Sequence, residues 1–352
     1  MSRKIFFSDV HIGAGKKIDG YEWFNKHAEL TNFLNYIKTQ GDIEEVVILG
    51  DFLDNWICPA DDSPPIFADI INAQANKTIL DALASLAENK KVIYITGNHD
   101  MTVTEADVDS ISPEIIFKDG GTVTTEAPSP YTTQDILAEH GHAHAMFNAP
   151  DYNNKKEGCL PLGYYISRLV AVKDSDGTAH INKSRLIKSI WSANKENNAM
   201  GELVLKGFLE YAGKDENFEF QMRRLDGTPY TEKAKDVIER YKDIYKQWKY
   251  GSRAMAVIAE FDNLKHTASK LSANNTKPIV MLGHSHEICG PKLDTLDSDP
   301  ETQYIYANCG AWTKDKDNPT YIETEKDDVT HTVRLMKWQE SDNPQQIFIA
   351  SI

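Results

Sequence analysis

The first hundred residues alternate between short apolar runs and longer segments with a helical period. The runs at 4–10, 45–51 and 91–100 have the length and composition of buried strands. Between them, apolar residues recur at helical spacing over 21–39 and 67–88. This alternation predicts an α/β unit with a mostly parallel sheet. Ligands of such sheets bind beyond the carboxyl ends of the strands, and each of the three runs ends in polar residues.

The pattern changes in the second half of the chain. Helical spacing dominates in segments 160–172, 184–211 and 234–248, and in an amphipathic stretch over 257–271. Strand-like runs return at 277–286, 302–312, 320–325 and 330–338. We therefore expect residues 1–150 and 276–352 to form one discontinuous α/β core. Residues 151–275 would be a largely helical insertion that acts as a cap.

Composition narrows the class of protein. The 352 residues are 41% hydrophobic and 26% charged, which is typical of a globular protein with a large core. No apolar run reaches the roughly 18 residues of a membrane helix, and the opening segment does not resemble a signal peptide. The four cysteines form no CxxC pair, so neither disulfides nor a thiolate zinc site is indicated, and we expect a cytoplasmic location. The net charge of −15 disfavours nucleic acid as a partner.

Polar clusters follow five of the apolar runs. They are Asp9-Val10-His11, Gly50-Asp51-Phe52-Leu53-Asp54, Gly97-Asn98-His99-Asp100, His140, and His284-Ser285-His286. Carboxylate and amide oxygens together with imidazole nitrogens suit manganese, iron or zinc. In an extended Asp-x-His or His-x-His the two outer side chains share one side, so both could face one metal cluster. A glycine before Asp51, Asn98 and His284 would let the chain turn sharply.

Each cluster by itself has an ordinary structural explanation. A turn closed by an Asx hydrogen bond would account for GDFLD, and a lone histidine at a strand end is usually packed or solvated. Five such clusters at the ends of successive strands favour a common site instead.

Taken together, D-x-H, GD-x-x-D, GNHD, a middle histidine and GH-x-H resemble the calcineurin-like metallophosphoesterase superfamily. The resemblance covers residues 4–148 and 277–338, and it implies an α/β/β/α sandwich core. The sequence looks nearest to the UDP-diacylglucosamine hydrolase-like branch, in which the middle ligand directly precedes a glycine. Those hydrolases carry arginine where this chain has His99, which points to a broader phosphoesterase activity.

The resemblance also implies a set of site residues. One metal ion would be held by Asp9, His11, Asp51 and His286, and a second by Asp51, Asn98, His140 and His284. Asp51 would bridge the two divalent ions (manganese, iron or zinc), which hold a bridging hydroxide as the nucleophile. His99 would be the general acid for the leaving group, and Asp54 would hold its imidazole in position.

Three histidines crowd the segment AEHGHAHAMFN, residues 138–148. His140 ends an apolar run and stands directly before a glycine, so it fits the position of the middle ligand. We expect His142 beside the ligands or near the substrate, and His144 on the surface or in packing. Lys16, Lys17, Arg223 and Arg224 could grip a phosphate, although such side chains are usually solvated surface.

The favoured hypothesis is a metal-dependent phosphatase or phosphodiesterase with two metal ions, acting on a small phosphorylated molecule. A pyrophosphohydrolase acting on a nucleotide-linked substrate is the alternative among enzymes. A metal-binding scaffold without catalysis is the alternative from another class, and the presence of His99 with a full ligand set argues against it. The oligomeric state is left open by the sequence.

Overall fold

The computed structural model describes residues 2–14, 23–120, 129–154, 158–171, 200–249, 251–313, 319–339 and 344–352. Its larger sheet has seven strands in the order β14-β13-β12-β1-β2-β3-β4. Their bounds are β1 Ser2–Phe7, β2 Ile43–Leu49, β3 Lys91–Ile95, β4 Ile116–Lys118, β12 Thr320–Lys326, β13 His331–Lys337 and β14 Gln345–Ser351. Strands β1 to β4 run parallel, whereas β12 pairs antiparallel with β1.

The second sheet has five strands in the order β10-β11-β9-β6-β5. Their bounds are β5 Tyr131–Thr132, β6 Ile136–Glu139, β9 Ile279–Leu282, β10 Ile288–Leu296 and β11 Asp299–Cys309. Strand β9 lies parallel to both β6 and β11, while β10 and β5 are antiparallel edges. In both sheets, strands that precede residue 150 are thus hydrogen-bonded to strands that follow residue 276.

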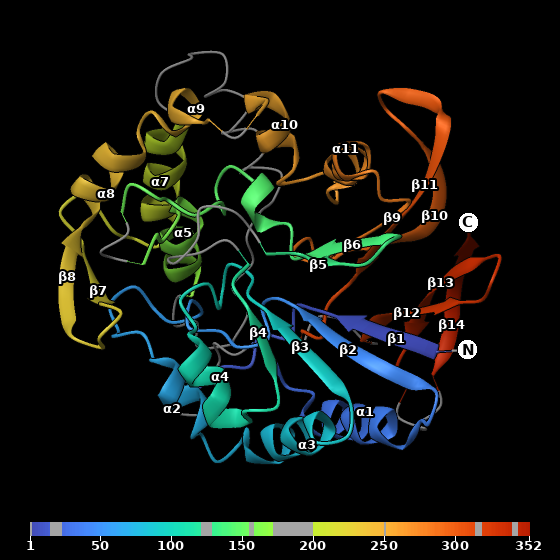
Figure 1. The fold of residues 1–352 in the computed structure, drawn as a ribbon. Coiled ribbons are helices and arrows are strands. Elements are labelled where there is room, and N and C mark those ends of the chain that lie inside the picture. The colour runs from blue at the N-terminus through green and yellow to red at the C-terminus, as the bar shows by residue number, and fades with distance from the viewer. Residues whose placement is uncertain are drawn as a thin grey trace.

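The two sheets pack face to face and helices cover their outer faces (Figure 1). In β1 the side chain of Phe6 joins the apolar cluster between the sheets, whereas Ile5 and Phe7 face the helices. Helices α1 (His27–Thr39) and α3 (Lys77–Ala87) cover the larger sheet, near α2 (Phe67–Ile71) and α4 (Glu105–Ile111). Helix α11 (Lys265–Asn275) covers the smaller one. The α/β/β/α sandwich predicted from the sequence is confirmed.

The described residues of segment 151–275 are largely helical but include a hairpin, and α11 at the end of this segment packs on the smaller sheet. The other helices of the segment are α5 (Leu162–Val170), α7 (Met200–Tyr211), α8 (Ala234–Tyr241), α9 (Ile244–Gln247) and α10 (Arg253–Ile258). Strands β7 (Glu219–Arg223) and β8 (Pro229–Lys233) form an antiparallel pair that the sequence analysis missed. Residues 184–199 of the predicted helix 184–211 lie outside the described residues. Figure 1 shows α5, α7, α8, α9 and α10 on the side of the molecule away from both termini.

Two predicted helices are broken in the structure. The segment 67–88 divides into α2 and α3 because the buried Asn76 amide turns inward and donates to Gly13 O (2.8 Å) and Ile70 O (2.9 Å). The segment 257–271 divides between α10 and α11, where Asn263 and Leu264 have positive φ values of 56° and 60°. Phe261, expected on an apolar helix face, is 43% exposed in that turn. Strands β10 and β14 were not predicted.

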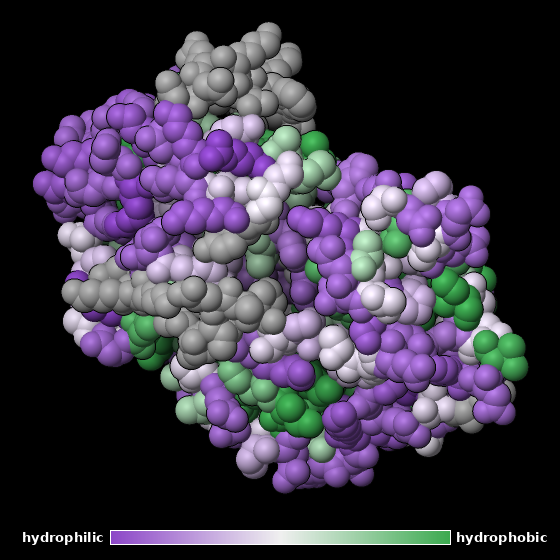
Figure 2. Space-filling model, turned by 45° about the horizontal axis from the view of Figure 1, so that its top comes forward, coloured by the Kyte–Doolittle hydropathy of each residue, from purple (hydrophilic) through white to green (hydrophobic). Residues whose placement is uncertain are grey.

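Most of the surface seen in Figure 2 is hydrophilic, and hydrophobic residues appear there in separate groups. Within the ranges that the structure describes, no helix is long and apolar enough to cross a membrane.

The buried Arg168 of α5 joins the insertion to the core loop after β2. Its guanidinium donates to the carbonyl oxygens of Cys58 (2.8 Å), Pro59 (2.8 Å), Asp62 (2.6 Å) and Gln221 (3.0 Å). A buried carbonyl that loses its donor costs about 1–3 kcal/mol. The Arg168 guanidinium therefore satisfies carbonyl groups that are buried at Cys58 and Pro59 and partly buried at Asp62 and Gln221.

Arg168→Met should therefore destabilise the protein. We expect a loss of about 2–4 kcal/mol in the free energy of unfolding, because several buried or partly buried carbonyls lose a cationic donor at once. Urea denaturation measures it. The control is Arg253→Met, which removes an exposed guanidinium bonded to Lys246 O and should change the value by no more than about 0.5 kcal/mol. Equal effects of the two variants would refute the anchoring role.

Candidate metal centre

The polar clusters lie on loops that leave the carboxyl ends of parallel strands in both sheets. The clusters around Asp9, Asp51 and Asn98 follow β1, β2 and β3 of the larger sheet, while His140 and His284 follow β6 and β9 of the smaller one. Backbone bonds tie the loops together, since Asp9 N donates to Gly50 O (3.2 Å) and Gly283 N donates to His140 O (3.0 Å). All five clusters therefore meet at one end of the sandwich.

The backbone is left-handed, not extended, at residues of three of these clusters. Positive φ values occur at Asp9 (55°), His11 (61°), Asp51 (53°), His284 (68°) and His286 (58°). Such a conformation costs a non-glycine residue roughly 1–2 kcal/mol, and clusters of strained residues are typical of functional sites. The expectation that Asp-x-His and His-x-His are extended is therefore wrong. Alternating left-handed residues bring their outer side chains together instead.

The first group of donor atoms comes from Asp9, His11, Asp51 and His286, and one donor atom from each lies within 4.8 Å of the others. His286 Nε2 is 3.3 Å from Asp9 Oδ1 and 3.0 Å from His11 Nε2. His11 Nε2 is 3.7 Å from Asp51 Oδ2. Except for the partly exposed His286, these side chains are buried. Two carboxylates and two imidazoles thus face a common point.

The second group shares Asp51 with the first. Donor atoms of Asp51, His140 and His284 lie within 4.8 Å of one another, and His140 Nε2 is 3.2 Å from Asp51 Oδ2. Asn98 completes the group, because its Oδ1 is 3.0 Å from both His140 Nε2 and His284 Nδ1. The structure therefore brings together all seven residues expected as ligands, in two groups joined at one carboxylate.

The donor set fits divalent metal ions. Carboxylate oxygens, an amide oxygen and imidazole nitrogens converge without a thiolate, which suits manganese, iron or zinc. The His140 Nδ1–H donates to Leu49 O at 2.7 Å, so Nε2 is left to face the site. This geometry is compatible with the expected ligands, whose role as ligands stays a prediction.

His99 and Asp54 form a third group at the edge of the site. His99 Nδ1 is 3.0 Å from Asp54 Oδ2, and the same oxygen lies 2.8 Å from His11 Nδ1. Asp54 therefore orients two imidazoles and not only the expected one. Its other oxygen accepts from the backbone N–H groups of Trp56 (2.8 Å) and Ile57 (3.1 Å), which fixes the carboxylate.

The surroundings of His99 favour its protonated form. Burial is the largest influence and lowers the pKa of His99, but the charges of Asp54 and Asp51 and the hydrogen bond to Asp54 outweigh it and raise the pKa above its usual value. The indole of Trp56 lies against the imidazole, with ring centroids 4.5 Å apart and planes at 30°. His99 thus lies between a carboxylate and an aromatic face.

The three crowded histidines have different surroundings. The ring of His142 is buried 5.3 Å from that of His140, and within the described part of the chain neither of its nitrogens has a hydrogen-bond partner. His142 belongs to neither group of metal-directed donor atoms. His144 is partly exposed, and its Nε2 lies 2.6 Å from Glu139 Oε1.

Sequence reasoning assigned no role to two residues at the site, Asp100 and Trp23. Asp100 accepts from Gly97 N (2.6 Å), Phe52 N (3.0 Å), Asp51 N (3.2 Å) and the Tyr94 hydroxyl (2.6 Å), so it fixes the loops that carry Asp51 and Asn98. Burial and the charge of Asp51 raise the pKa of Asp100 to about 6. The position of Asp100 at the end of the GNHD motif was the sequence signal that could have assigned it to the site.

Trp23 precedes α1, and no pattern in the sequence marks it. Its ring centroid lies 5.0 Å from that of His11, 5.5 Å from His286 and 5.6 Å from His99. The indole therefore packs against the site on the side of the first donor group.

The basic residues expected to grip phosphate are only partly described. Lys16 and Lys17 lie outside the described residues. Arg223, at the end of β7, donates to Ser63 Oγ at 3.3 Å, and Arg224 lies 4.4 Å from the ring centroid of Tyr230. A phosphate contact of either arginine stays a prediction.

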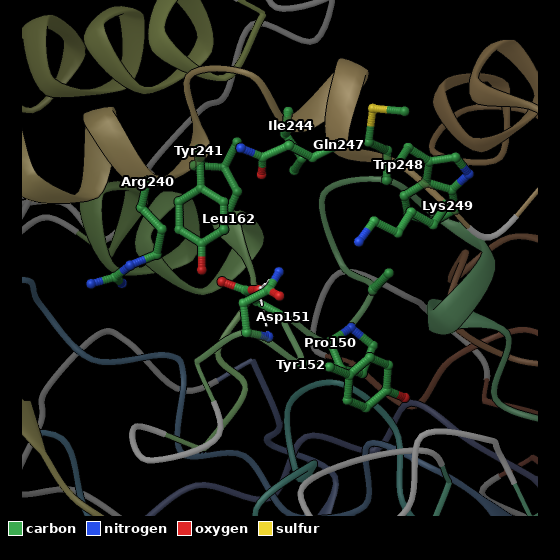
Figure 3. A pocket seen from close by; sticks show the side chains of 13 residues that line it. Pro150, Asp151, Tyr152, Leu162, Arg240, Tyr241, Ile244, Gln247, Trp248 and Lys249 are labelled. Atoms are coloured by element: carbon green, nitrogen blue, oxygen red, sulfur yellow. Dashed lines mark hydrogen bonds between the residues drawn. The ribbon is translucent and has the colours of Figure 1, made fainter.

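A cavity of about 470 Å³ opens between the insertion and the loop that follows His140. It is lined by Met146, Ala149, Pro150, Asp151, Tyr152, Asn153, Leu162, Arg240, Tyr241, Ile244, Gln247, Trp248 and Lys249. Figure 3 shows Asp151, Tyr241 and Lys249 pointing toward its interior. The cavity combines aromatic walls with charges of both signs.

Comparison with known proteins agrees with the fold. The model of the calcineurin-like phosphoesterase family matches residues 2–288, and the chain belongs to this family. This membership and the converging Asp and His side chains support a metal-dependent phosphoesterase. No curated protein matches the sequence.

Three solved structures illustrate the likeness. The nuclease MPE of Pseudomonas putida is 21% identical over 39% of this chain and 53% of its own, with a TM-score of 0.25, so the match spans about half of that nuclease. A single mutant of Vps29 from Entamoeba histolytica is 10% identical over 98% of both chains, with a TM-score of 0.35. A conserved protein of Streptococcus pneumoniae, described as a predicted phosphoesterase, is 10% identical over 100% of this chain and 97% of its own, with a TM-score of 0.33. Similarities of this size carry no argument about activity.

Gly97 allows the donor groups to approach each other. A Cβ at this position would overlap Asp51 Oδ1 and lie 2.8 Å from His140 Cδ2. Gly97→Ala should therefore push Asp51 and His140 apart and lower the content of divalent metal after desalting. Gly41→Ala is the control, because nothing lies within 4 Å of its Cβ position. Metal analysis of both variants tests this, and full metal content in Gly97→Ala would contradict it.

Proposed function

We propose that this protein is a phosphoester hydrolase that uses two divalent metal ions and acts on a small phosphorylated molecule. The observation that carries the proposal is the pair of donor groups sharing the Asp51 carboxylate. One ion would be held by Asp9, His11, Asp51 and His286, and the other by Asp51, Asn98, His140 and His284. When bound, such a pair supplies Lewis-acid stabilisation of the phosphoryl oxygens and activation of the attacking water.

The chain itself would supply the proton for the leaving group. His99 Nδ1 is occupied by Asp54, so the other ring nitrogen, Nε2, is the one available to donate. Asp54 and Asp51 favour the protonated imidazole, which is the form a general acid needs before the bond breaks. Trp56 restricts the tilt of the ring. These contacts support His99 as the general acid and Asp54 as the residue that positions it.

The insertion would act as a cap that selects the organic part of the substrate. The loop of residues 146–153 that lines the cavity follows the segment of His140, so the cavity begins a few residues from the proposed ligands. Its size suits a small molecule. The net charge of −15 disfavours nucleic acid as the substrate.

A pyrophosphohydrolase of nucleotide-linked substrates is the alternative, because the same donor groups could hold a diphosphate. A hydrolysis panel with added Mn²⁺ tests both. It compares chromogenic mono- and diesters of phosphate with nucleotide diphosphate conjugates. Turnover of a mono- or diester supports the proposal, whereas turnover confined to the conjugates favours the alternative. Fully metallated protein that hydrolyses none of them would be a metal-binding scaffold.

The shared position of Asp51 predicts a specific loss of metal. Asp51→Asn should lower the metal content more than His142→Ala does, because Asp51 belongs to both donor groups and His142 to neither. Metal analysis after desalting measures the difference. If His142→Ala loses metal while His140→Ala retains both ions, His142 is the ligand and the assignment of His140 is wrong.

The acid role of His99 predicts a dependence on the leaving group. His99→Asn should retain both metal ions and lose about 10²–10⁴-fold in kcat on an alkyl phosphoester, because an alkoxide needs a proton as it leaves. A nitrophenolate leaves with little help, so the loss on the nitrophenyl ester should be far smaller. Steady-state rates on the two substrates decide it, and equal losses would exclude the acid role.

A further inference from the structure

A line of hydrogen bonds runs from the insertion to Asn98. Glu260 lies in the turn between α10 and α11 and uses both carboxylate oxygens. Oε1 accepts from the backbone N–H of Phe147, and Oε2 accepts from Asn148 Nδ2 at 2.9 Å. Asn148 Oδ1 in turn accepts from Asn98 Nδ2 at 3.3 Å. The opposite end of the Asn98 amide, Oδ1, faces His140 and His284.

The chemistry of these groups gives the line a direction. A carboxylate only accepts, so Asn148 must present its NH₂ to Glu260 and its oxygen to Asn98. Asn98 must then present its NH₂ to Asn148, which leaves its oxygen toward the metal centre. An amide oxygen can coordinate a cation, whereas an amide NH₂ has no free lone pair to offer. The orientation of Asn98 thus depends on a charge two side chains away.

We propose that Glu260 is a positioning residue that, through Asn148, fixes the Asn98 amide so that its oxygen faces the metal centre. This inference rests on the proposed function in that Asn98 is taken as a ligand of one ion. Residues behind metal ligands commonly set their orientation, and their removal typically weakens metal binding about 10–100-fold.

The competing explanation is that Glu260 only holds the backbone at Phe147. Glu260→Gln separates the two ideas, because the introduced glutamine keeps one oxygen for Phe147 N. Its NH₂ then faces Asn148, whose amide must flip and present its NH₂ to Asn98. Asn98 flips in turn and directs its own NH₂ toward the metal centre. A backbone role would survive this change, whereas the positioning role would not.

The first test is calorimetric titration of chelator-stripped protein with Mn²⁺. Burial raises the pKa of Glu260 to about 7, against the effect of its N–H donors, so the titration is run at about pH 8.5 to keep the carboxylate ionised. Glu260→Gln should weaken the binding of one of the two Mn²⁺ ions about 10–100-fold and leave the affinity for the other within about twofold of the wild type. The matched control is Glu210→Gln, which replaces an exposed glutamate of α7 and should leave the affinity for both Mn²⁺ ions unchanged.

The second test replaces the hydrogen-bond donor that Asn98 presents to Asn148 by an acceptor. Asn98→Asp puts a carboxylate opposite Asn148 Oδ1, which Glu260 prevents from turning, so two acceptors face each other. Adding Glu260→Gln lets Asn148 flip and donate to the new carboxylate. Glu260→Gln should therefore weaken Mn²⁺ binding in the wild-type background and strengthen it in the Asn98→Asp background. A purely structural glutamate would weaken it in both.

The outcomes separate this inference from the proposed function. Two Mn²⁺ ions and phosphoester turnover in the wild type, with no loss in Glu260→Gln, would overturn the inference and leave the function standing. A wild type that binds fewer than two ions would overturn both. If Glu260→Gln does not fold, as judged by circular dichroism, Asn148→Leu decides, because it interrupts the line while Glu260 still accepts from Phe147 N. Binding of both ions with wild-type affinity in Asn148→Leu would refute the inference.

Discussion

The Asp51 carboxylate belongs to both groups of donor atoms, and the loops around it are arranged to hold it there. Its backbone is left-handed, its N–H is bound by the buried Asp100, and no side chain at Gly97 stands in its way. The left-handed backbone has a cost in strain and the buried Asp100 a cost in desolvation. All three features are needed because a carboxylate within reach of several imidazoles must be fixed in one position. The rest of the site is arranged around this position.

The sandwich architecture explains why donors so distant in sequence can meet. Parallel strands of the larger sheet contribute Asp9, Asp51 and Asn98, while the smaller sheet contributes His140 and His284 from strands packed against the first set. A single sheet would offer only one row of strand ends. Two sheets facing each other offer two rows, so a pair of donor groups can form between them.

The insertion is tied to this centre by two buried polar side chains. Arg168 holds the loop after β2, which follows Asp54, and Glu260 holds the segment of Phe147 and Asn148 beside Asn98. Both contacts also border the apolar cluster that the insertion shares with Trp56 and Met101 of the core. The cavity is lined by Met146 and Ala149, which flank the Phe147–Asn148 segment that Glu260 holds.

In the sequence, the strand and helix periods were enough to predict an α/β unit, because they are visible in the order of residues. The strand-end motifs are local as well, and their resemblance to a known family implied the sandwich and the residues that gather at one end of it. The sequence also favoured His140 over His142, since only His140 ends an apolar run and stands directly before a glycine, as in the family branch that it resembles. Tertiary structure alone decided the break at Asn76, whose amide serves carbonyls of two segments, and the strained backbone at the ligands, which contacts between loops stabilise. It also placed Trp23, Asp100 and Glu260 at the site. Their partners are distant in sequence or set by the exact course of a loop, and a pattern of hydrophobic and polar positions contains no information about either.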